Sequence, residues 1–584
     1  MKKELINETK TAIVEYLKDF LSSCGYEANI SDLKLYEQIS APPKFEDGQY
    51  ALPMFILSKQ LKKKPVELAG EFVSFMNAKE SGQFLEVKNL GPYVNFQLNF
   101  KTFIPSTLKS ISDKSFFNKQ YFLDKQKTMI EYSQPNTHKE LHVGHMRNLC
   151  LGNAIVRMLR EVGTEVISAT YPGDVGTHIA KALWYLKKNN LEAPDENKGA
   201  WLGEQYSKAN ALLQDQLGTE LEDKNRAELT LILKELKAQQ GEYFLLWKET
   251  RQWSIDLMKS IYQWADVEFD AWFFESDVNK DSLELVEQYL EKGFFKIDQG
   301  AVGIDLDEYK LGFFMVRKSD GNGLYSTKDL ELARRKFQDY KIERNLYIVD
   351  QRQSRHFKQV FKTLELMGFD HADKCEHLAY EFVELANGAI SSRKGNIVAL
   401  EDLIEQMQSA IKEKYLHKYQ DQWSKDEIES TAKIIANGSI KYGMLKIDSQ
   451  KKIIFEMDEW LRLDGNSGPY LQYTFARIQS ICDKAGVIDN SFHEFLTTDK
   501  EKKLVFKLSQ YQCVLQEACL KSAPSLICHY LYELCQEFNS FYADHPIMNQ
   551  EKNIKHARLS LIRNFSEVLK NALSLLGIEC PLRM

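Results

Sequence analysis

The 584-residue chain lacks several features that mark whole classes of protein. No apolar run is long enough to span a bilayer, so a membrane role is not supported. The nine cysteines are scattered and never form a C-x-x-C pair, which disfavours zinc sites and disulfide frameworks and fits reduced thiols in the cytosol. The first residues, MKKELINETK, lack the apolar core of a signal peptide. We therefore expect a cytoplasmic protein without a metal site.

The chain also lacks a net positive charge. The net charge of -7 gives no overall attraction to nucleic acid, so local basic patches must bind any polyanionic partner. The sequence has no internal repeat and no low-complexity tract. With 43% hydrophobic and 27% charged residues, the composition is that of a globular protein, and the length allows several domains.

The pattern of predicted elements divides the chain into three parts. Residues 1–113 mix helical and alternating patterns and predict an α+β unit. Residues 114–405 alternate strands with helices, which favours a parallel sheet with crossover helices, interrupted by a mostly helical insertion at about 179–279. The strand-like segments there are 128–132, 165–169, 312–316, 346–349 and 377–382. Residues 406–584 show helical patterns only and predict an α-helical bundle.

The most informative segment is 130–153, IEYSQPNTHKELHVGHMRNLCLGN. It runs from a strand through a polar turn into a helix, and Gly163 stands where that helix should end. A helix N-terminus attracts anions, Gly144 allows a ligand to come close, and His142 and His145 add donors. This arrangement is typical of a triphosphate cradle. On the H-x-G-H tetrapeptide alone, two buried histidines with satisfied hydrogen bonds are an equally good interpretation.

A second cluster lies far downstream, in a short cationic loop. The loop contains Ser391, Ser392, Arg393, Lys394 and Gly395. Its Arg and Lys could stabilise charge that develops on phosphates during a reaction. Taken by itself, the loop is equally typical of a solvated turn.

Together, the two clusters resemble the class I aminoacyl-tRNA synthetases, and the wider sequence resembles the arginyl-tRNA synthetase family. The segments that match follow that family's order over most of the chain: IEYSQPNTHKELHVGHMRN, YPGDVGTH, LYSTKDLELA, YIVDQRQSRHF, SSRKGNIVALEDL, LDGNSGPYLQYTFARIQSI and LLGIECPLRM. GPYVNFQL, at 91–98, resembles the closing strand of the family's N-terminal domain. The resemblance implies an accessory domain that contacts tRNA at 1–113, a Rossmann-like catalytic domain at 114–405 and an α-helical anticodon-binding domain at 406–584.

The resemblance also implies an activity. It is the ATP-dependent attachment of L-arginine to tRNA(Arg) through an arginyl-adenylate, with Mg²⁺ accompanying ATP, no zinc, and a monomeric enzyme. Binding of tRNA would precede activation of arginine. Two alternatives stay open: a catalytically silent tRNA-binding paralogue, and a class I synthetase for another amino acid. Intact His142, His145 and Lys394 speak against the first, and Asp329 speaks against a glutamyl enzyme, which needs cations for its substrate.

Individual site residues follow from the same resemblance. The catalytic set is His142, His145, Lys139, Arg393 and Lys394. The ATP site comprises His142, Gly144, His145, Ser391, Ser392 and Lys394. The arginine site comprises Glu131, Asn136, Tyr325, Asp329 and Gln353, in which carboxylates suit the fixed donors of a guanidinium. The tRNA contacts are Tyr470, Gln472, Tyr473, Arg477 and Met584.

Two positions depart from the class pattern. The loop lacks the first lysine of the class I K-M-S-K motif, and Lys139, just before the histidine box, stands where family members of this kind compensate. Gln134 replaces a family serine that contacts the amino acid. Structural roles compete with several assignments: Asp329 could cap a helix, and Tyr325 could be a core aromatic. Tyr470 and Tyr473 could pack between helices.

Overall fold

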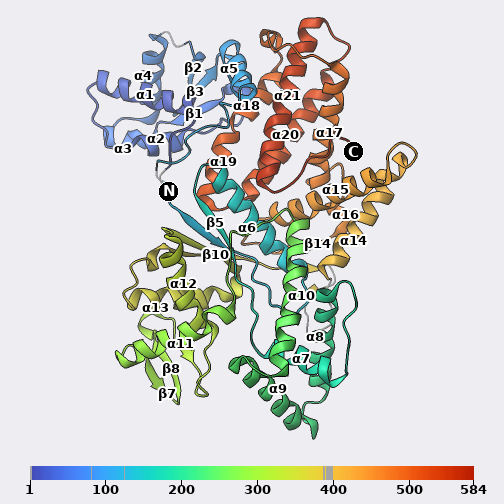
Figure 1. The fold of residues 1–584 in the computed structure, drawn as a ribbon. Helices are drawn as coiled ribbons and strands as arrows, with labels where there is room; N and C mark the ends of the chain where they lie inside the picture. Colours follow the sequence, from blue (N-terminus) through green and yellow to red (C-terminus); the bar gives the residue numbers. More distant parts are fainter. Residues whose placement is uncertain (1–2, 80–81, 124, 386–387, 390–398) are drawn as a thin grey trace. The chain divides into compact units, whose positions relative to one another are not determined.

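The computed structural model describes residues 3–79, 82–123, 125–385, 388–389 and 399–584. The chain divides into two compact units (Figure 1). One unit comprises residues 1–124, 471–573 and 580–584, and the other comprises 125–470 and 574–579. In the ranges that the structure describes, no helix is long and apolar enough to cross a membrane. The domain boundaries predicted at 113 and 405 stay predictions, because a compact unit can join segments from separate domains.

A parallel sheet forms the centre of the unit that contains residues 125–470. Among the described residues its strand order is β11-β10-β4-β5-β6. The strands are β4 (Thr128–Glu131), β5 (Val166–Thr170), β6 (Ala271–Trp272), β10 (Arg344–Asp350) and β11 (Cys375–Tyr380). Strand β4 pairs on both sides, with Met129 opposite Asn345 and Ile167, and all four of its residues are buried. The predicted parallel sheet is therefore confirmed, with the short β6 as a strand that the sequence pattern did not reveal.

Helices connect and cover these strands. They are α6 (Val143–Glu161), α7 (Thr177–Lys188), α8 (Lys198–Asp215), α9 (Leu221–Ala238), α10 (Glu242–Trp264), α11 (Glu275–Glu291), α12 (Tyr325–Tyr340) and α13 (Ser354–Leu366). Helices α7 to α10 lie between β5 and β6 in the chain, which confirms the predicted helical insertion. Each crossover between parallel neighbours contains a helix, as parallel pairing requires.

The strand expected at 312–316 forms, but it does not join the parallel sheet. It is β9 (Phe313–Arg317), which pairs antiparallel with β8 (Ala301–Asp305), and β8 pairs with β7 (Lys296–Asp298). The connection between β8 and β9 is too short for a crossover, so the two strands can only pair as a hairpin. The sequence pattern was right about the strand and wrong about its partner.

Helix α6 packs closely against the end of β4. Gly152 makes this possible, because a Cβ there would overlap the ring of Tyr132, which directly follows the strand. The helix ends as predicted: Gly163 has φ +79°, and the N–H of Thr164 returns to the carbonyl of Leu159 at 2.9 Å. The start of α6 is thereby held at the carboxyl end of the central strand.

Among the described residues, this unit also contains further strands and α-helices. They are β12 (Val383–Leu385), β13 (Gly388–Ala389), β14 (Ile453–Phe455), α14 (Leu400–Ile411), α15 (Lys425–Leu445) and α16 (Met457–Trp460). Residues 574–579 also belong to this unit, and they are bound by side chains from α6 and α15. Lys441 is 1% exposed and donates a hydrogen bond to the carbonyl of Gly577, and burial lowers its pKa to about 8. Arg157 Nη1 donates to the carbonyl of Ser574 at 3.3 Å.

The other unit combines a small sheet with helices from both ends of the chain. The antiparallel sheet has the order β1-β3-β2, with β1 at Tyr50–Pro53, β2 at Phe84–Leu90 and β3 at Tyr93–Leu98. The N-terminal helices are α1 (Glu8–Ser23), α2 (Asp32–Gln38), α3 (Phe55–Leu61), α4 (Pro65–Asn77) and α5 (Phe100–Ser112). The C-terminal helices are α17 (Gly468–Ala485), α18 (Asp499–Ser509), α19 (Tyr511–Lys521), α20 (Ser525–Asp544) and α21 (Lys552–Leu575).

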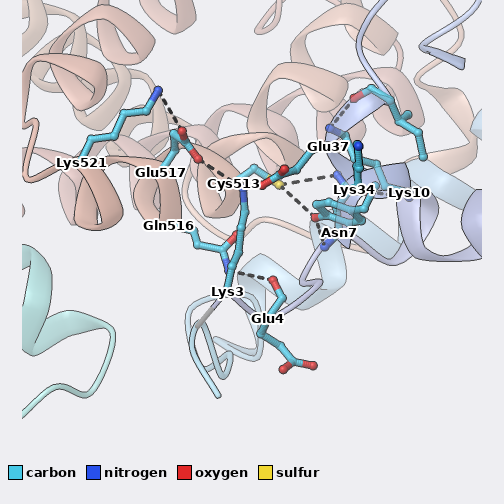
Figure 2. Close-up of polar contacts among 12 residues, drawn as sticks. Lys3, Glu4, Asn7, Lys10, Lys34, Glu37, Cys513, Gln516, Glu517 and Lys521 are labelled. Carbon is cyan, nitrogen blue, oxygen red and sulfur yellow. Dashed lines mark hydrogen bonds and ion pairs between the residues drawn. The ribbon is translucent and has the colours of Figure 1, made fainter. Parts of the chain in front are cut away.

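Polar side chains of α19 bind the first residues of the chain (Figure 2). Lys3 pairs with Glu517 at 3.2 Å, and Gln516 Nε2 donates to the carbonyls of Glu4 and Tyr121 at 2.8 and 2.7 Å. Because Gln516 is fully buried, its amide nitrogen depends on these two carbonyls for its hydrogen bonds. The N-terminal and C-terminal segments therefore form one unit through specific hydrogen bonds.

The close contact between α6 and β4 gives a first prediction. Gly152→Ala should lower the midpoint of thermal unfolding, because overpacking in a dense core costs about 1–3 kcal/mol. Gly70→Ala, in α4, is the matched control: nothing lies within 4 Å of its Cβ, so the better helix propensity of alanine should leave the midpoint unchanged or raise it. Calorimetry on both variants measures the difference, and equal midpoints would contradict the packing argument.

Candidate active site

The two histidines of the H-x-G-H segment cap helix α6 reciprocally. His142 Nδ1 accepts a hydrogen bond from the N–H of Gly144 at 3.2 Å, and His145 Nδ1 accepts one from the N–H of His142 at 3.1 Å. The ring centroids lie 3.9 Å apart. These bonds satisfy two of the backbone donors that a helix start leaves unpaired. The side chains are therefore held in place by the local backbone.

This capping also fixes which ring nitrogens carry protons. A neutral imidazole that accepts at Nδ1 must carry its proton at Nε2, so both rings present an Nε2–H donor. Burial lowers the pKa of His142 to about 4 and that of His145 well below its usual value. Both histidines are consequently neutral donors at physiological pH, suited to phosphate oxygens without adding charge.

A cavity of about 130 Å³ opens beside this cap. Its lining consists of Asn136, Lys139, Glu140, His142, His145, Tyr206 and Ser207. Helix α8 of the insertion forms one wall, because Gly203 comes so close to the backbone that its Cβ would lie 2.8 Å from the nitrogen of Glu140. Tyr206, one turn further, places its ring 5.4 Å from Lys139 Nζ. The structure thus brings Lys139, His142 and His145 together around one space.

The described chain resumes beside this cap at Ala399. Ala399 pairs with His142 in an isolated antiparallel bridge, and the N–H of Leu400 donates to the carbonyl of Leu141 at 2.9 Å. The predicted cationic loop precedes Ala399 directly in the chain. Its residues Ser391, Ser392, Arg393, Lys394 and Gly395 lie outside the described residues.

A carboxylate and a lysine are buried at the exit of β4. Glu131 is 3% exposed, and it forms an ion pair with Lys336, which is completely buried. Gln134 Nε2 donates to the other oxygen of Glu131 at 3.3 Å. Removing one partner of a buried ion pair leaves an uncompensated charge and typically costs about 3–5 kcal/mol. Lys336 therefore balances the charge of Glu131 where the strand meets the site.

Asp329 and Tyr325 occupy the first turns of α12. Tyr325 is 61% exposed, which excludes a role as a core aromatic. Asp329 is the fifth residue of the helix, so it does not cap the helix start. Its Oδ2 lies 2.6 Å from His356 Nε2. Both structural alternatives raised by the sequence are therefore removed for these two residues.

Glu275, at the start of α11, is a site residue that the sequence analysis missed. It is 5% exposed and pairs with Lys328 at 2.7 Å. Burial raises the pKa of Glu275, and Lys328 opposes that shift. Gly173 fits between Glu275 and Asn136, since its Cβ would lie 3.3 Å from Glu275 Oε1. The only sequence signal was an acidic residue in a first helical turn, a common feature that carries no functional meaning by itself.

Asp174 organises the turn that follows β5. The side chain is fully buried, and it binds Arg251 Nε at 2.7 Å and both the N–H and the hydroxyl of Ser276 at 2.9 and 2.7 Å. These bonds connect the YPGD segment to α10 and α11. Because Ser276 directly follows Glu275, this network also fixes the position of the turn relative to Glu275.

Comparison with known proteins matches almost the whole chain. A family model described as "tRNA synthetases class I (R), catalytic domain" matches residues 108–457, "Arginyl tRNA synthetase N terminal domain" matches 7–98, and "DALR anticodon binding domain" matches 471–584. An arginine--tRNA ligase of Bdellovibrio bacteriovorus is 48% identical, with 97% of this chain and 98% of the relative covered. The chain belongs to the arginyl-tRNA synthetase family.

Further relatives extend this family assignment. An arginine--tRNA ligase of Halothermothrix orenii is 33% identical and covers 98% of this chain and 99% of its own length. The solved structure of Thermus thermophilus arginyl-tRNA synthetase superposes with a TM-score of 0.80 at 25% identity, covering 98% of this chain and 100% of that one. The predicted family and fold class are both confirmed.

The remaining residues expected from the family pattern have different environments. Gln353 is exposed and directly precedes α13. Tyr473 and Arg477 are exposed and one turn apart on α17, and Arg477 Cζ lies 4.3 Å from the ring centroid of Tyr542. Gln472 on the same helix is fully buried, so its side chain faces the interior. Tyr470 and Met584 are half-buried.

A buried histidine next to the site predicts a pH dependence of stability. His138 is fully buried between Thr137 and Thr250, and burial lowers its pKa to about 3. Below the unfolded pKa of about 6.5 only the unfolded chain takes up the proton, so stability falls with pH from about 6.5 toward 3. At pH 5 the loss from this group is about 2 kcal/mol.

Urea unfolding at pH 7 and pH 5 measures this loss. His138→Gln, which keeps hydrogen-bonding capacity without a titratable ring, should lose less stability between the two pH values than the native chain. An identical loss in both proteins would mean that His138 is not the responsible group.

Proposed function

We propose that the chain attaches L-arginine to tRNA(Arg) in two steps, with ATP as the energy source. In the first step the carboxylate of arginine attacks the α-phosphorus of ATP, forms arginyl-adenylate and releases diphosphate. In the second step a ribose hydroxyl of the terminal tRNA adenosine takes the arginyl group, and AMP leaves. Membership of the arginyl-tRNA synthetase family over nearly the full length supports this proposal.

The observation that carries the proposal is the pairing of two sites at one edge of the sheet. Neutral histidine donors and Lys139 surround a cavity at the start of α6, and Asp329 stands in the first turns of α12 with Tyr325 exposed beside it. The first set suits phosphates, and the second suits a cation with several donors. An amino acid with a guanidinium side chain satisfies the second set.

Neither step requires a nucleophile from the protein. Catalysis can come from aligning the reactants and from neutralising charge on the phosphates. We assign His142 and His145 to phosphate oxygens through their Nε2–H donors, and Gly144 to close approach of the nucleotide. ATP enters as its Mg²⁺ complex. Lys139, Arg393 and Lys394 would offset negative charge, and Ser391 and Ser392 would contact ATP.

The arginine substrate would contact residues from three elements. We assign its guanidinium to Asp329 and Tyr325 and its α-amino and carboxylate ends to Glu131, Asn136 and Gln353. His356 would orient Asp329, since it binds Oδ2 and leaves Oδ1 to the substrate. Gln134 would support Glu131 instead of the substrate, because its amide already donates to that carboxylate.

For tRNA we assign direct contacts to Tyr473 and Arg477, whose side chains are exposed. The family pattern adds Tyr470 and Met584, which are half-buried. Aromatic residues beside a basic one can stack on unpaired bases and bind phosphates. Gln472 would act by positioning α17, because a buried side chain does not reach RNA. A monomeric enzyme in the cytoplasm completes the proposal, taken from the family pattern.

Joining radiolabelled arginine to tRNA tests the function directly. The native chain should retain label on filters only when ATP and tRNA(Arg) are both present. His145→Ala should slow adenylate formation by about 100-fold, the usual cost of losing one stabilising donor, and leave tRNA affinity unchanged. Label from another amino acid would favour a different class I enzyme, and binding of tRNA without any charging would favour the silent paralogue.

Asp329→Asn tests the guanidinium site. The change keeps the size of the side chain and removes its charge, so the KM for arginine should rise steeply, by about 100-fold or more, because interactions with charged partners exceed neutral ones. The KM for ATP should stay constant. ATP–pyrophosphate exchange in the presence of tRNA measures both constants, and a KM for arginine within error of the native value would remove Asp329 from the site.

A further inference from the structure

Tyr171 carries a buried hydroxyl that the proposed mechanism does not use. The residue directly follows β5 and is 9% exposed. Its Oη has no hydrogen-bond partner among the residues that the structure describes. Because a buried polar group without a partner costs about 1–3 kcal/mol, such a group calls for an explanation.

The ring of Tyr171 packs between the two helices that carry site carboxylates. It contacts Val278 of α11 and Leu332 of α12 in one apolar cluster. Val278 lies three residues after Glu275, and Leu332 lies three residues after Asp329. Residues three apart share one face of a helix, so the ring lies on the same faces as both carboxylates.

Negative charge surrounds this hydroxyl. Burial raises the pKa of Tyr171 well above its ordinary value, and the next contribution comes from Asp329, followed by Glu275, Glu131 and Asp174. The tyrosine is therefore uncharged at any physiological pH. Four carboxylates near one neutral hydroxyl create a region that strongly favours a cation.

Three of these four carboxylates already have a cationic partner. Glu275 pairs with Lys328, Glu131 pairs with Lys336, and Asp174 pairs with Arg251. Asp329 differs, because within the described ranges its ion-pair partner is the imidazole of His356. A further cation would therefore balance the charge best beside Asp329. This position lies on the face of α12 that Tyr171 contacts.

We propose that Tyr171 is a further specificity-determining residue, whose hydroxyl oxygen accepts an N–H of the substrate guanidinium while Asp329 binds another edge of the same group. The inference rests on the proposed function. A guanidinium is planar and has five N–H donors in fixed directions, so it can reach a carboxylate and a hydroxyl at once. A compact ammonium could neutralise Asp329 but would leave the hydroxyl unpaired. Tyr171 thus makes the site selective for the shape of the substrate side chain, in addition to its charge.

Tyr171→Phe removes the hydroxyl and keeps the ring that packs on Val278 and Leu332. The KM for arginine in tRNA-supported ATP–pyrophosphate exchange should rise about 10- to 100-fold, the loss expected for a hydrogen bond to a charged group. The kcat and the KM for ATP should stay within about twofold of the native values. The unfolding midpoint without arginine should not fall, because the hydroxyl that is lost has no hydrogen-bond partner among the described residues.

Tyr132→Phe is the matched control. Tyr132 is fully buried, and its hydroxyl also has no partner among the described residues, but its ring contacts Phe269, with centroids 4.6 Å apart. Its hydroxyl is not assigned to substrate, so this variant should keep the native KM for arginine. An equal rise in both variants would overturn the inference, since the effect would then be general to buried hydroxyls in this unit.

The Asp329→Asn variant distinguishes a failure of this inference from a failure of the proposed function. If Asp329→Asn raises the KM for arginine and Tyr171→Phe leaves it native, the guanidinium site stands and the role of Tyr171 is wrong. If neither variant changes this KM, the guanidinium binds elsewhere, and the assigned site and the role of Tyr171 both fall. A fall in the unfolding midpoint of Tyr171→Phe that accounts for the kinetic change would mean a structural role, which also overturns the inference.

Discussion

The reciprocal cap at the start of α6 is the interaction on which the arrangement of the site depends. His142 and His145 accept hydrogen bonds from the first backbone N–H groups of the helix, and this contact fixes both rings and their tautomers. The same pair of bonds therefore stabilises a helix end and prepares two donors for a ligand. Since Gly152 lets α6 approach β4 closely, the donors stand at the carboxyl edge of the sheet, where parallel α/β folds bind their ligands.

Charge balance determines the other half of the site. Lys328, Lys336 and Arg251 each neutralise one buried carboxylate, and each of these pairs joins elements that are far apart in the sequence. A cluster of acids without such partners would protonate and lose its affinity for a cation. These partners balance the charges of three carboxylates, whereas within the described ranges Asp329 has the imidazole of His356 as its ion-pair partner.

Local signals were sufficient for much of the fold and for placing His142 and His145 at the start of a helix, but they did not reveal the reciprocal cap. The helix Val143–Glu161 with Gly163 after its end, the helical insertion and the C-terminal helices each follow from periodicity and end signals within one segment. The predicted pairing of β9 was wrong because the residue pattern of a strand does not determine which strand it pairs with. Strand β6 was not predicted because two residues are too few to show an alternating pattern. Glu275 and Lys328 could not be predicted, because their burial arises from a contact between helices 53 residues apart in sequence.

The short tail segment that Lys441 and Arg157 bind has a consequence for dissecting this enzyme into fragments. Residues 574–579 come near the end of the chain, but they belong with 125–470. A truncation at 470 would strip the acceptor from an almost fully buried amine and open a hydrated gap beside α6, the helix that begins with the histidine cap. A stable catalytic fragment would therefore have to retain residues 574–579, either by circular permutation or as a separately added peptide. A single proteolytic cut at 470 would leave the two pieces associated through this segment.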